Sequence, residues 1–258
     1  MQNNSQSFSI IFCVNRSSEY LQASIDSILK QTHPSFRFLI GANACSDELL
    51  AELQQHVHGD RRVDIFRSDV PQLSYNLNLL LDHATTEWVV RMDADDVSEP
   101  DRLERIAHHI SLCPDVDVWG SWATVIDENG EKTGDFRPGL TTRAIRRSFP
   151  YSNQICHPTV AFRRSFWLEM RGYLGGYVSE DYDLWLRALN RDIQIRNIPE
   201  QLLQYRVHKS QVSGSRRGYA EVAGHWLREF MLRPSLFNFN GLLISSLKSI
   251  AKIVTGAK

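Results

Sequence analysis

The stretch Glu87-Trp88-Val89-Val90-Arg91-Met92-Asp93-Ala94-Asp95-Asp96 decides the fold class of this chain. Trp88–Met92 is a short apolar run, which predicts a buried strand, and three carboxylates come directly after it. In parallel sheets that are covered by helices, ligands bind beyond the carboxyl ends of the strands. The acidic cluster Asp93–Asp96 therefore stands where a binding site is expected.

Strand and helix patterns alternate on both sides of this stretch. Short β-branched and aromatic runs predict further strands at Phe8–Val14, Phe36–Ala42 and Val63–Arg67. Apolar residues at helical spacing, with a Ser46 N-cap and one proline start, predict helices at Glu19–Gln31, Asp47–Gln55, Leu73–His83 and Pro100–Ser111. This alternation predicts an α/β fold with a parallel sheet that is sandwiched by helices.

The second half of the chain has a more mixed pattern. It predicts strands at Val116–Ile126, Val160–Arg163, Ile193–Ile198 and Leu202–Val207. A hairpin turn is expected at Glu128–Glu131, and helices are expected at Thr141–Ser148 and Tyr182–Asn190. One mixed α/β domain with a C-terminal extension fits both halves.

Composition excludes several classes of protein. Of the 258 residues, 42% are hydrophobic and 23% charged, which is typical of a globular protein and excludes disorder. The net charge of −1 argues against nucleic acid as a partner bound through overall charge. The four cysteines lie far apart, without the close spacing of a zinc site, which favours a reducing compartment. With neither a signal peptide nor an apolar membrane span in the sequence, we expect a cytoplasmic protein, soluble or peripheral to the membrane.

The acidic cluster can hold a divalent cation. Hard cations take oxygen ligands, and Mg²⁺ or Mn²⁺ is commonly held by one or two carboxylates plus substrate phosphates. The alternative is an acidic turn that places negative charge at a helix N-terminus. An EF-hand loop is excluded because Ser98 replaces the turn glycine and Pro100 interrupts the loop.

Two other places carry candidate chemistry. Glu180-Asp181 follows a glycine-rich segment and opens a helix, where a carboxylate is well placed to accept a proton from a bound hydroxyl, or simply caps the helix. His208 follows a predicted strand and is either a metal or phosphate contact or a structural histidine. The sequence has no GxSxG elbow, P-loop or GxGxxG motif, which argues against hydrolase, P-loop and dinucleotide-binding functions.

Taken together and in this order, these segments resemble glycosyltransferase family 2, whose members have the GT-A fold, a Rossmann-like nucleotide-binding fold. The likeness covers about residues 8–213. The segments that resemble the family are Ser9–Arg16, Tyr20-Leu21 with Ser27–Thr32, Leu77-Asn78, Glu87–Asp96 with Pro100–Glu104, Glu180–Arg187 and Tyr205–His208. The resemblance implies an inverting transfer of a sugar from a nucleotide-sugar donor to a saccharide or lipid-linked saccharide acceptor, as in cell-surface polysaccharide or glycolipid synthesis.

The resemblance also implies roles for individual residues. Asp181 is the expected catalytic base, with Glu180 beside it. Residues expected at the nucleotide-sugar are Phe12, Val14, Asn15, Arg16, Asn43, Asn78, Asp93, Ala94 and Asp95. Mn²⁺ or Mg²⁺ is the expected cofactor, and Asp95, Asp93 and His208 are its expected ligands; the metal neutralises charge that develops on the leaving diphosphate.

One segment departs from the family pattern. Where members usually carry paired aspartates after the second strand, this chain has Ala42-Asn43, so the contact with the nucleotide base is altered. A neutral amide still hydrogen-bonds a base edge. This departure keeps open a catalytically degenerate homologue that acts as a binding or scaffold protein. A sugar-phosphate nucleotidyltransferase is the other alternative, although its glycine-rich basic loop is missing here.

The chain divides into a transferase domain, residues 1–213, and a tail, residues 214–258. Within the domain, the nucleotide-sugar half covers about residues 1–112 and the acceptor half about 113–213. From Arg216 onward there are seven basic and two acidic residues. Apolar residues form one helical stripe, flanked by Lys248 and Lys252; they are Phe239, Leu243, Leu247, Ile250 and Val254. Such a basic amphipathic helix either lies in a membrane surface or packs on the domain or a partner.

Overall fold

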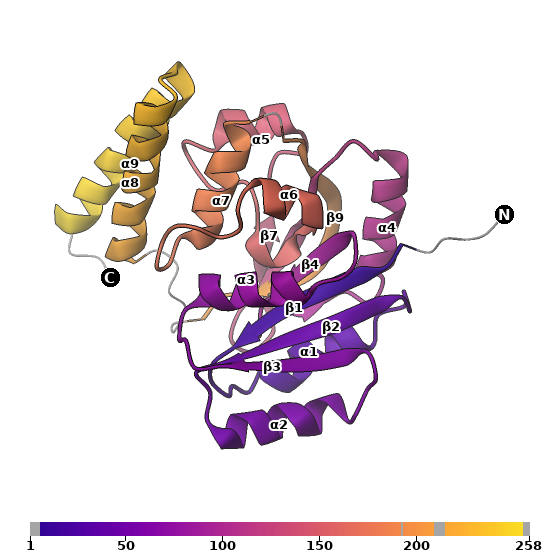
Figure 1. The fold of residues 1–258 in the computed structure, drawn as a ribbon. Coiled ribbons are helices and arrows are strands. Elements are labelled where there is room, and N and C mark those ends of the chain that lie inside the picture. The colour runs from indigo at the N-terminus through magenta and orange to yellow at the C-terminus, as the bar shows by residue number, and fades with distance from the viewer. Residues whose placement is uncertain (1–5, 192, 209–214, 255–258) are drawn as a thin grey trace.

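The computed structural model of the chain describes residues 6–191, 193–208 and 215–254. Within these residues one sheet of nine strands runs through the molecule in the order β3-β2-β1-β4-β8-β6-β9-β5, with β7 paired to β6 (Figure 1). The strands are β1 (Phe8–Val14), β2 (Phe36–Asn43), β3 (Val63–Ser68), β4 (Trp88–Met92), β5 (Val97–Ser98), β6 (Val118–Ile126), β7 (Lys132–Phe136), β8 (Ala161–Arg163) and β9 (Ile195–Arg206).

The first four strands of this order are parallel and form the predicted α/β half. Side chains of β1 alternate between the two faces, since successive residues of a strand point to opposite sides. Phe8, Ile10 and Phe12 pack with α1 (Leu21–Leu29), α2 (Asp47–Val57) and α4 (Arg102–Leu112). Ile11 and Cys13 pack on the other face with α3 (Leu73–His83). The predicted helix-covered sheet is therefore confirmed, although α1 and α4 begin two residues later than predicted.

The second half makes the sheet mixed. Strand β8 is antiparallel to both β4 and β6, and β9 runs parallel to β6. Three helices cover this half: α5 (Thr142–Ser148), α6 (Arg164–Glu169) and α7 (Glu180–Leu189). The strands predicted at Ile193–Ile198 and Leu202–Val207 form one continuous strand, β9. The predicted break is not observed, because the register of β9 against β6 shifts at Ser121/Trp122 and this bulge accommodates Pro199 without ending the strand.

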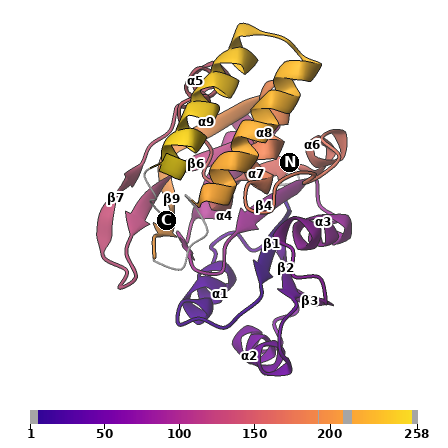
Figure 2. The ribbon, with the colours of Figure 1, turned by 90° about the vertical axis from the view of Figure 1, so that its left-hand side faces the viewer.

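The C-terminal residues form a helical hairpin of α8 (Arg216–Leu232) and α9 (Leu236–Val254), which lie side by side (Figure 2). Trp226 of α8 is fully buried in the same apolar cluster as Trp185 of α7. Gly241 of α9 faces the Trp226 ring, where an added Cβ would lie 2.2 Å from a ring carbon. The predicted domain boundary between residues 213 and 214 lies outside the described residues. No helix among the described residues is long and apolar enough to cross a membrane.

Candidate active site

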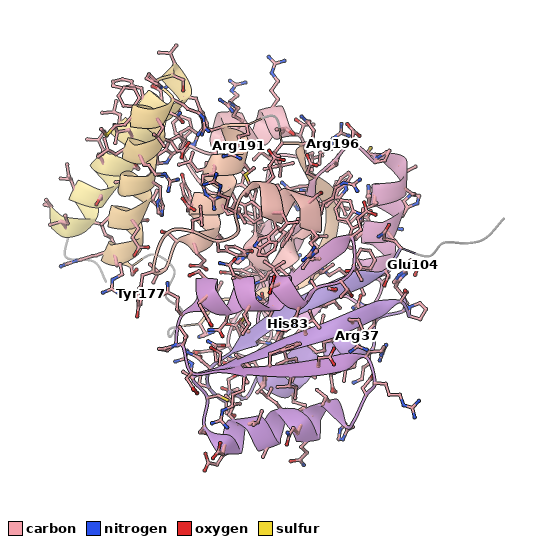
Figure 3. The ribbon with its side chains drawn as sticks, in the orientation of Figure 1. Arg37, His83, Glu104, Tyr177, Arg191 and Arg196 are labelled. Atoms are coloured by element: carbon pink, nitrogen blue, oxygen red, sulfur yellow. The ribbon has the colours of Figure 1, made fainter. Side chains whose placement is uncertain are left out.

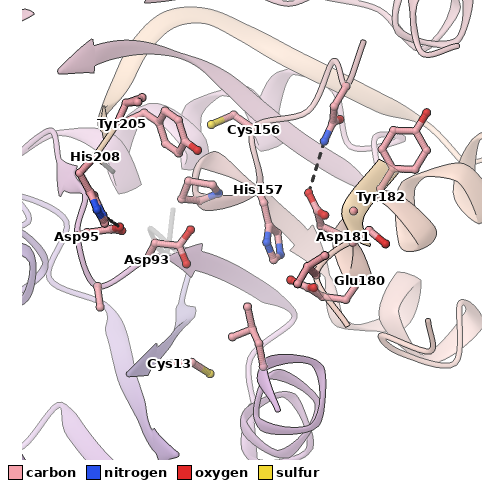
Figure 4. A pocket seen from close by; sticks show the side chains of 18 of the residues that line it. Cys13, Asp93, Asp95, Cys156, His157, Glu180, Asp181, Tyr182, Tyr205 and His208 are labelled. Atoms are coloured by element: carbon pink, nitrogen blue, oxygen red, sulfur yellow. Dashed lines mark hydrogen bonds and ion pairs between the residues drawn. The ribbon is translucent and has the colours of Figure 1, made fainter. Parts of the chain in front are cut away.

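A cavity of about 1560 Å³ opens at the carboxyl ends of β1, β2 and β4. Its opposite wall comes from residues 149–158, from residues 177–182 at the start of α7, and from the end of β9. The hairpin helices add Tyr219, Ser245 and Lys248 to the lining. The fold therefore brings the acidic cluster, the Glu180-Asp181 pair and His208 to one place (Figure 4).

The acidic cluster divides into two carboxylates that line the cavity and one that does not. Asp93 and Asp95 line it, whereas Asp96 is fully buried. The Asp96 carboxylate accepts a hydrogen bond from the backbone N–H of Arg206 at 2.8 Å, which ties the cluster to the end of β9. Burial raises the pKa of Asp96 well above its usual range. Asp96 thus has a structural role.

Asp93 is held in place by one contact from the sheet and one from α1. Its carboxylate forms an ion pair with the guanidinium of Arg91, which is fully buried in the sheet. Its backbone carbonyl accepts a hydrogen bond from the Ser24 hydroxyl of α1 at 2.9 Å. Burial raises the pKa of Asp93, and the charge of Arg91 opposes this rise. The carboxylate is thereby fixed at the cavity wall.

Asp95 contacts His208 directly. His208 Nε2 lies 2.9 Å from Asp95 Oδ2, although 113 residues separate the two in the sequence. Arg206 supports the pair, since its Nε donates to the backbone carbonyl of Asp95 at 2.8 Å and its guanidinium lies 4.2 Å from the centre of the Tyr20 ring. Two of the three predicted metal ligands are therefore in contact.

Three protein ligands for a metal are not assembled, however. Over residues 6–191, 193–208 and 215–254, no group of three or more His, Cys, Asp or Glu side chains is arranged to hold a metal ion. Asp93 is paired with Arg91 instead of standing beside His208. The donor set fits a hard divalent cation only if substrate phosphates complete its shell, which is the usual arrangement for Mg²⁺.

Glu180 and Asp181 face the acidic cluster across the cavity, with His157 between them and Asp93 (Figure 4). Asn153 Nδ2 lies 3.4 Å from Asp181 Oδ2. Burial, with a smaller contribution from the charge of Asp93, raises the pKa of Asp181 to about 6. Burial and then the charge of Asp181 raise the pKa of Glu180 to about 8. A carboxyl with a pKa near neutral is well matched to general-base chemistry.

The predicted nucleotide-sugar residues fall into two groups. Most line the cavity beside Asp93 and Asp95: Val14, Asn15, Arg16, Asn43 and Ala94. Asn43 is almost fully buried, and its Oδ1 makes no hydrogen bond within the described residues. This buried acceptor lies where the family usually carries a base-binding carboxylate.

The structure places Phe12 and Asn78 elsewhere. Phe12 is fully buried in the core on the α1 side of the sheet, because alternation along β1 points its neighbours Cys13 and Ile11 the other way. Asn78 bonds both backbone groups of Tyr173, accepting from its N–H at 2.9 Å and donating to its carbonyl at 3.0 Å. Neither residue lines the cavity, although the sequence predicted both at the nucleotide-sugar.

Most residues of the cavity wall opposite the strand ends were not identified from the sequence. Residues 149–158 contribute Tyr151, Asn153, Cys156 and His157, and they carry no motif that would have identified them. His157 Nε2 lies 2.8 Å from the Tyr173 hydroxyl, and burial lowers the pKa of His157 well below its usual range. The neutral imidazole of His157 therefore lies between Asp93 and the Glu180-Asp181 pair.

Residues 9–171 match the family model described as Glycosyl transferase family 2. The chain belongs to this family. Over 248 residues it is 38% identical to the O-antigen biosynthesis glycosyltransferase WbnJ of Escherichia coli, covering 95% of this chain and 96% of the relative. It is 25% identical to an E. coli UDP-Gal:alpha-D-GlcNAc-diphosphoundecaprenol beta-1,3-galactosyltransferase over 229 residues, 86% of this chain and 82% of the relative.

The fold agrees with this membership. The crystal structure of Staphylococcus aureus TarS residues 1–349 in complex with UDP-GlcNAc superposes with a TM-score of 0.70. Its sequence is 15% identical, and the match covers 93% of this chain and 79% of that one. The GT-A fold expected from the sequence is confirmed, and the chain is a glycosyltransferase that moves sugar from a nucleotide-sugar donor to an acceptor hydroxyl. The nucleotidyltransferase alternative is set aside.

Proposed function

We propose that this enzyme builds a cell-surface polysaccharide of the O-antigen kind, transferring sugar with inversion to a lipid-linked saccharide at the cytoplasmic face of the membrane. The main observation in support of this chemistry is that Asp93 and Asp95, which follow β4, line the same cavity as Asp181 on the opposite wall. The full-length likeness to an O-antigen transferase supports the pathway class. The likeness to a transferase named for a diphosphoundecaprenol acceptor supports the lipid link.

In the proposed mechanism Asp181 is the general base. The Asp181 carboxylate takes the proton of the acceptor hydroxyl while the hydroxyl oxygen attacks the anomeric carbon. The bond from that carbon to the donor diphosphate breaks, and the diphosphate leaves with the electron pair. Because attack and departure are in line, the anomeric configuration inverts. Asn153 orients the Asp181 carboxylate, and the neutral His157 stands between the base and Asp93.

The nucleotide-sugar lies, in this proposal, along Val14–Arg16, Asn43 and Asp93–Asp95. The Asn43 amide oxygen, buried without a partner, is available to the base edge. Asp95 and His208 would hold Mn²⁺ or Mg²⁺ together with the donor diphosphate, and Asp93 would contact the ribose. When bound, the metal supplies positive charge to the leaving diphosphate.

A thermal-shift panel tests the proposed function. UDP-, GDP-, dTDP- and CMP-linked sugars are added to the folded protein with Mn²⁺, with Mg²⁺ and with EDTA. A ligand that binds only the folded state raises the melting temperature, so we expect one nucleotide class to raise it, and to do so less in EDTA. The variant Asp95→Asn should lose the metal-dependent part of the shift. If no nucleotide-sugar raises the melting temperature, the donor and metal site proposed here is contradicted.

A further inference from the structure

The segment in front of the proposed base is held by the C-terminal hairpin. Glu221 on α8 directs one carboxylate oxygen, Oε2, at three donors of that segment. The backbone N–H groups of Tyr177 and Val178 donate at 2.9 and 3.1 Å, and the Ser179 hydroxyl donates at 2.8 Å. Figure 3 shows Tyr177 at the outer end of this loop, below the hairpin. One side chain thus fixes three successive residues immediately before Glu180-Asp181.

A second contact from α8 locks the same loop. The Ser179 hydroxyl also lies 3.0 Å from Nε2 of His225, one helical turn after Glu221. Ser179 and His225 are both buried, so this contact is shielded from water. Within the loop, Gly176 adopts a φ of +77°, and an added Cβ there would lie 2.6 Å from the Ser179 hydroxyl, so this turn requires glycine.

Further along, α8 holds the first turn of α7. Arg228 pairs with Asp183 Oδ1 at 2.6 Å, and Arg187 pairs with Asp183 Oδ2 at 2.8 Å. Trp226 Nε1 donates to the Tyr182 hydroxyl at 2.9 Å. Residues 177–183, with the proposed base at their centre, are therefore fastened to α8 on both sides of Asp181.

We propose that Glu221 is a positioning residue for catalysis: it holds the Tyr177–Ser179 loop so that the Asp181 carboxylate faces the donor. The inference rests on the proposed function. It makes the α8–α9 hairpin, which lies outside residues 9–171 of the family match, part of the active site. Glu221 touches no reacting atom and acts through the loop. A displacement of about 1 Å at a catalytic group costs on the order of 100-fold in rate.

The test compares Glu221→Ala, Glu221→Gln and, as a matched control, Glu229→Ala. Glu229 is a buried carboxylate on the same helix that makes no hydrogen bond or ion pair with the Tyr177–Ser179 loop; it pairs with Arg228, which keeps its own pair with Asp183, and with Arg233, the residue that follows α8. The first measurement is kcat and KM for hydrolysis of the donor found by thermal shift, which needs no acceptor. The second is amide hydrogen exchange of the peptide that covers residues 176–182.

We expect Glu221→Ala to lower kcat by about 10- to 100-fold, to leave the KM for donor within about twofold, and to speed exchange in residues 177–181. Glu221→Gln keeps an oxygen acceptor and should lie between the wild type and Glu221→Ala. Glu229→Ala should lower the melting temperature and keep kcat.

Two results would overturn the inference. One is a kcat that follows melting temperature across all three variants, which marks a merely structural role. The other is unchanged exchange in residues 177–181 of Glu221→Ala. If the wild type binds no donor, that result contradicts the proposed function and is separate from the inference about Glu221. The exchange measurement then still decides whether Glu221 holds the loop.

Discussion

At the scale of single residues, the candidate site contains two carboxyls, Glu180 and Asp181, whose charged forms are disfavoured by burial. Burial raises the pKa of Asp181 to about 6 and that of Glu180 to about 8. Between the ordinary carboxyl pKa and these values, the folded chain binds more protons than the unfolded chain, so the free energy of unfolding falls as pH rises. The window runs from about pH 4 to about 6 for Asp181 and on to about 8 for Glu180. The charged forms of this pair therefore lower the free energy of unfolding near neutral pH.

The variant Asp181→Asn separates the contribution of the carboxyl to catalysis from its effect on stability. The amide cannot accept the hydroxyl proton, so kcat should fall by about 100- to 10,000-fold with donor affinity unchanged. It also removes the desolvated charge, so the melting temperature should rise at pH 7.5, and this gain should vanish near pH 4, where the wild-type carboxyl is protonated as well. Steady-state kinetics, donor titration and melting curves at the two pH values check this. Full activity of the variant would remove Asp181 from the mechanism.

The same scale shows what a sequence reveals about a site. Asp93, Asp95 and Asp181 could be predicted because charged residues at a strand end or helix start are visible in the sequence. The positions of Phe12 and Asn78 could not be predicted. Which face of β1 meets the ligand depends on the register and on which helices cover it. The contacts of Asn78 depend on a turn formed 95 residues later in the sequence.

At the scale of elements, local patterns predicted most strands and helices of both halves, whereas tertiary contacts decided two features of the second half. In β9, Pro199 falls opposite a register shift, so a residue that usually ends a strand is tolerated. The cavity wall formed by residues 149–158 has only short helical turns and draws its order from contacts with distant segments. Neither feature has a periodic signal that a sequence can show.

Close packing of α9 on α8 depends on Gly241. An added methyl group would lie 2.2 Å from the Trp226 ring, which is itself fully buried. Gly241→Ala should therefore lower the free energy of unfolding by about 1–3 kcal/mol despite the better helix propensity of alanine. Gly224→Ala on α8 is the matched control, since an added Cβ meets nothing within 4 Å there, and it should stabilise by about 0.5–1 kcal/mol. Denaturant melts of both variants check this; equal effects would mean that the helices do not pack as described.

At the scale of the whole molecule, the hairpin has two faces with different roles. Its inner face carries Trp226 into the core and Glu221 to the Tyr177–Ser179 loop. Its outer face exposes a row of apolar side chains on α9: Phe239, Leu243, Leu247, Ile250, Ile253 and Val254. The chain from Arg216 onward carries seven basic and two acidic residues. We predict that this apolar stripe, together with the positive charge, binds the surface of an anionic membrane.

Vesicle sedimentation tests this membrane contact. The protein should sediment with vesicles of phosphatidylglycerol and phosphatidylcholine, less with phosphatidylcholine alone, and less in high salt, because salt screens the basic residues. The double change Leu247→Gln and Ile250→Gln should weaken binding and leave donor hydrolysis intact, since neither side chain lines the cavity. Leu112→Gln removes an equally exposed apolar side chain at the end of α4 and should change nothing. A protein that binds neither kind of vesicle would contradict the membrane contact, and a protein that doubles its mass in solution through this face would place a second copy on α9 instead.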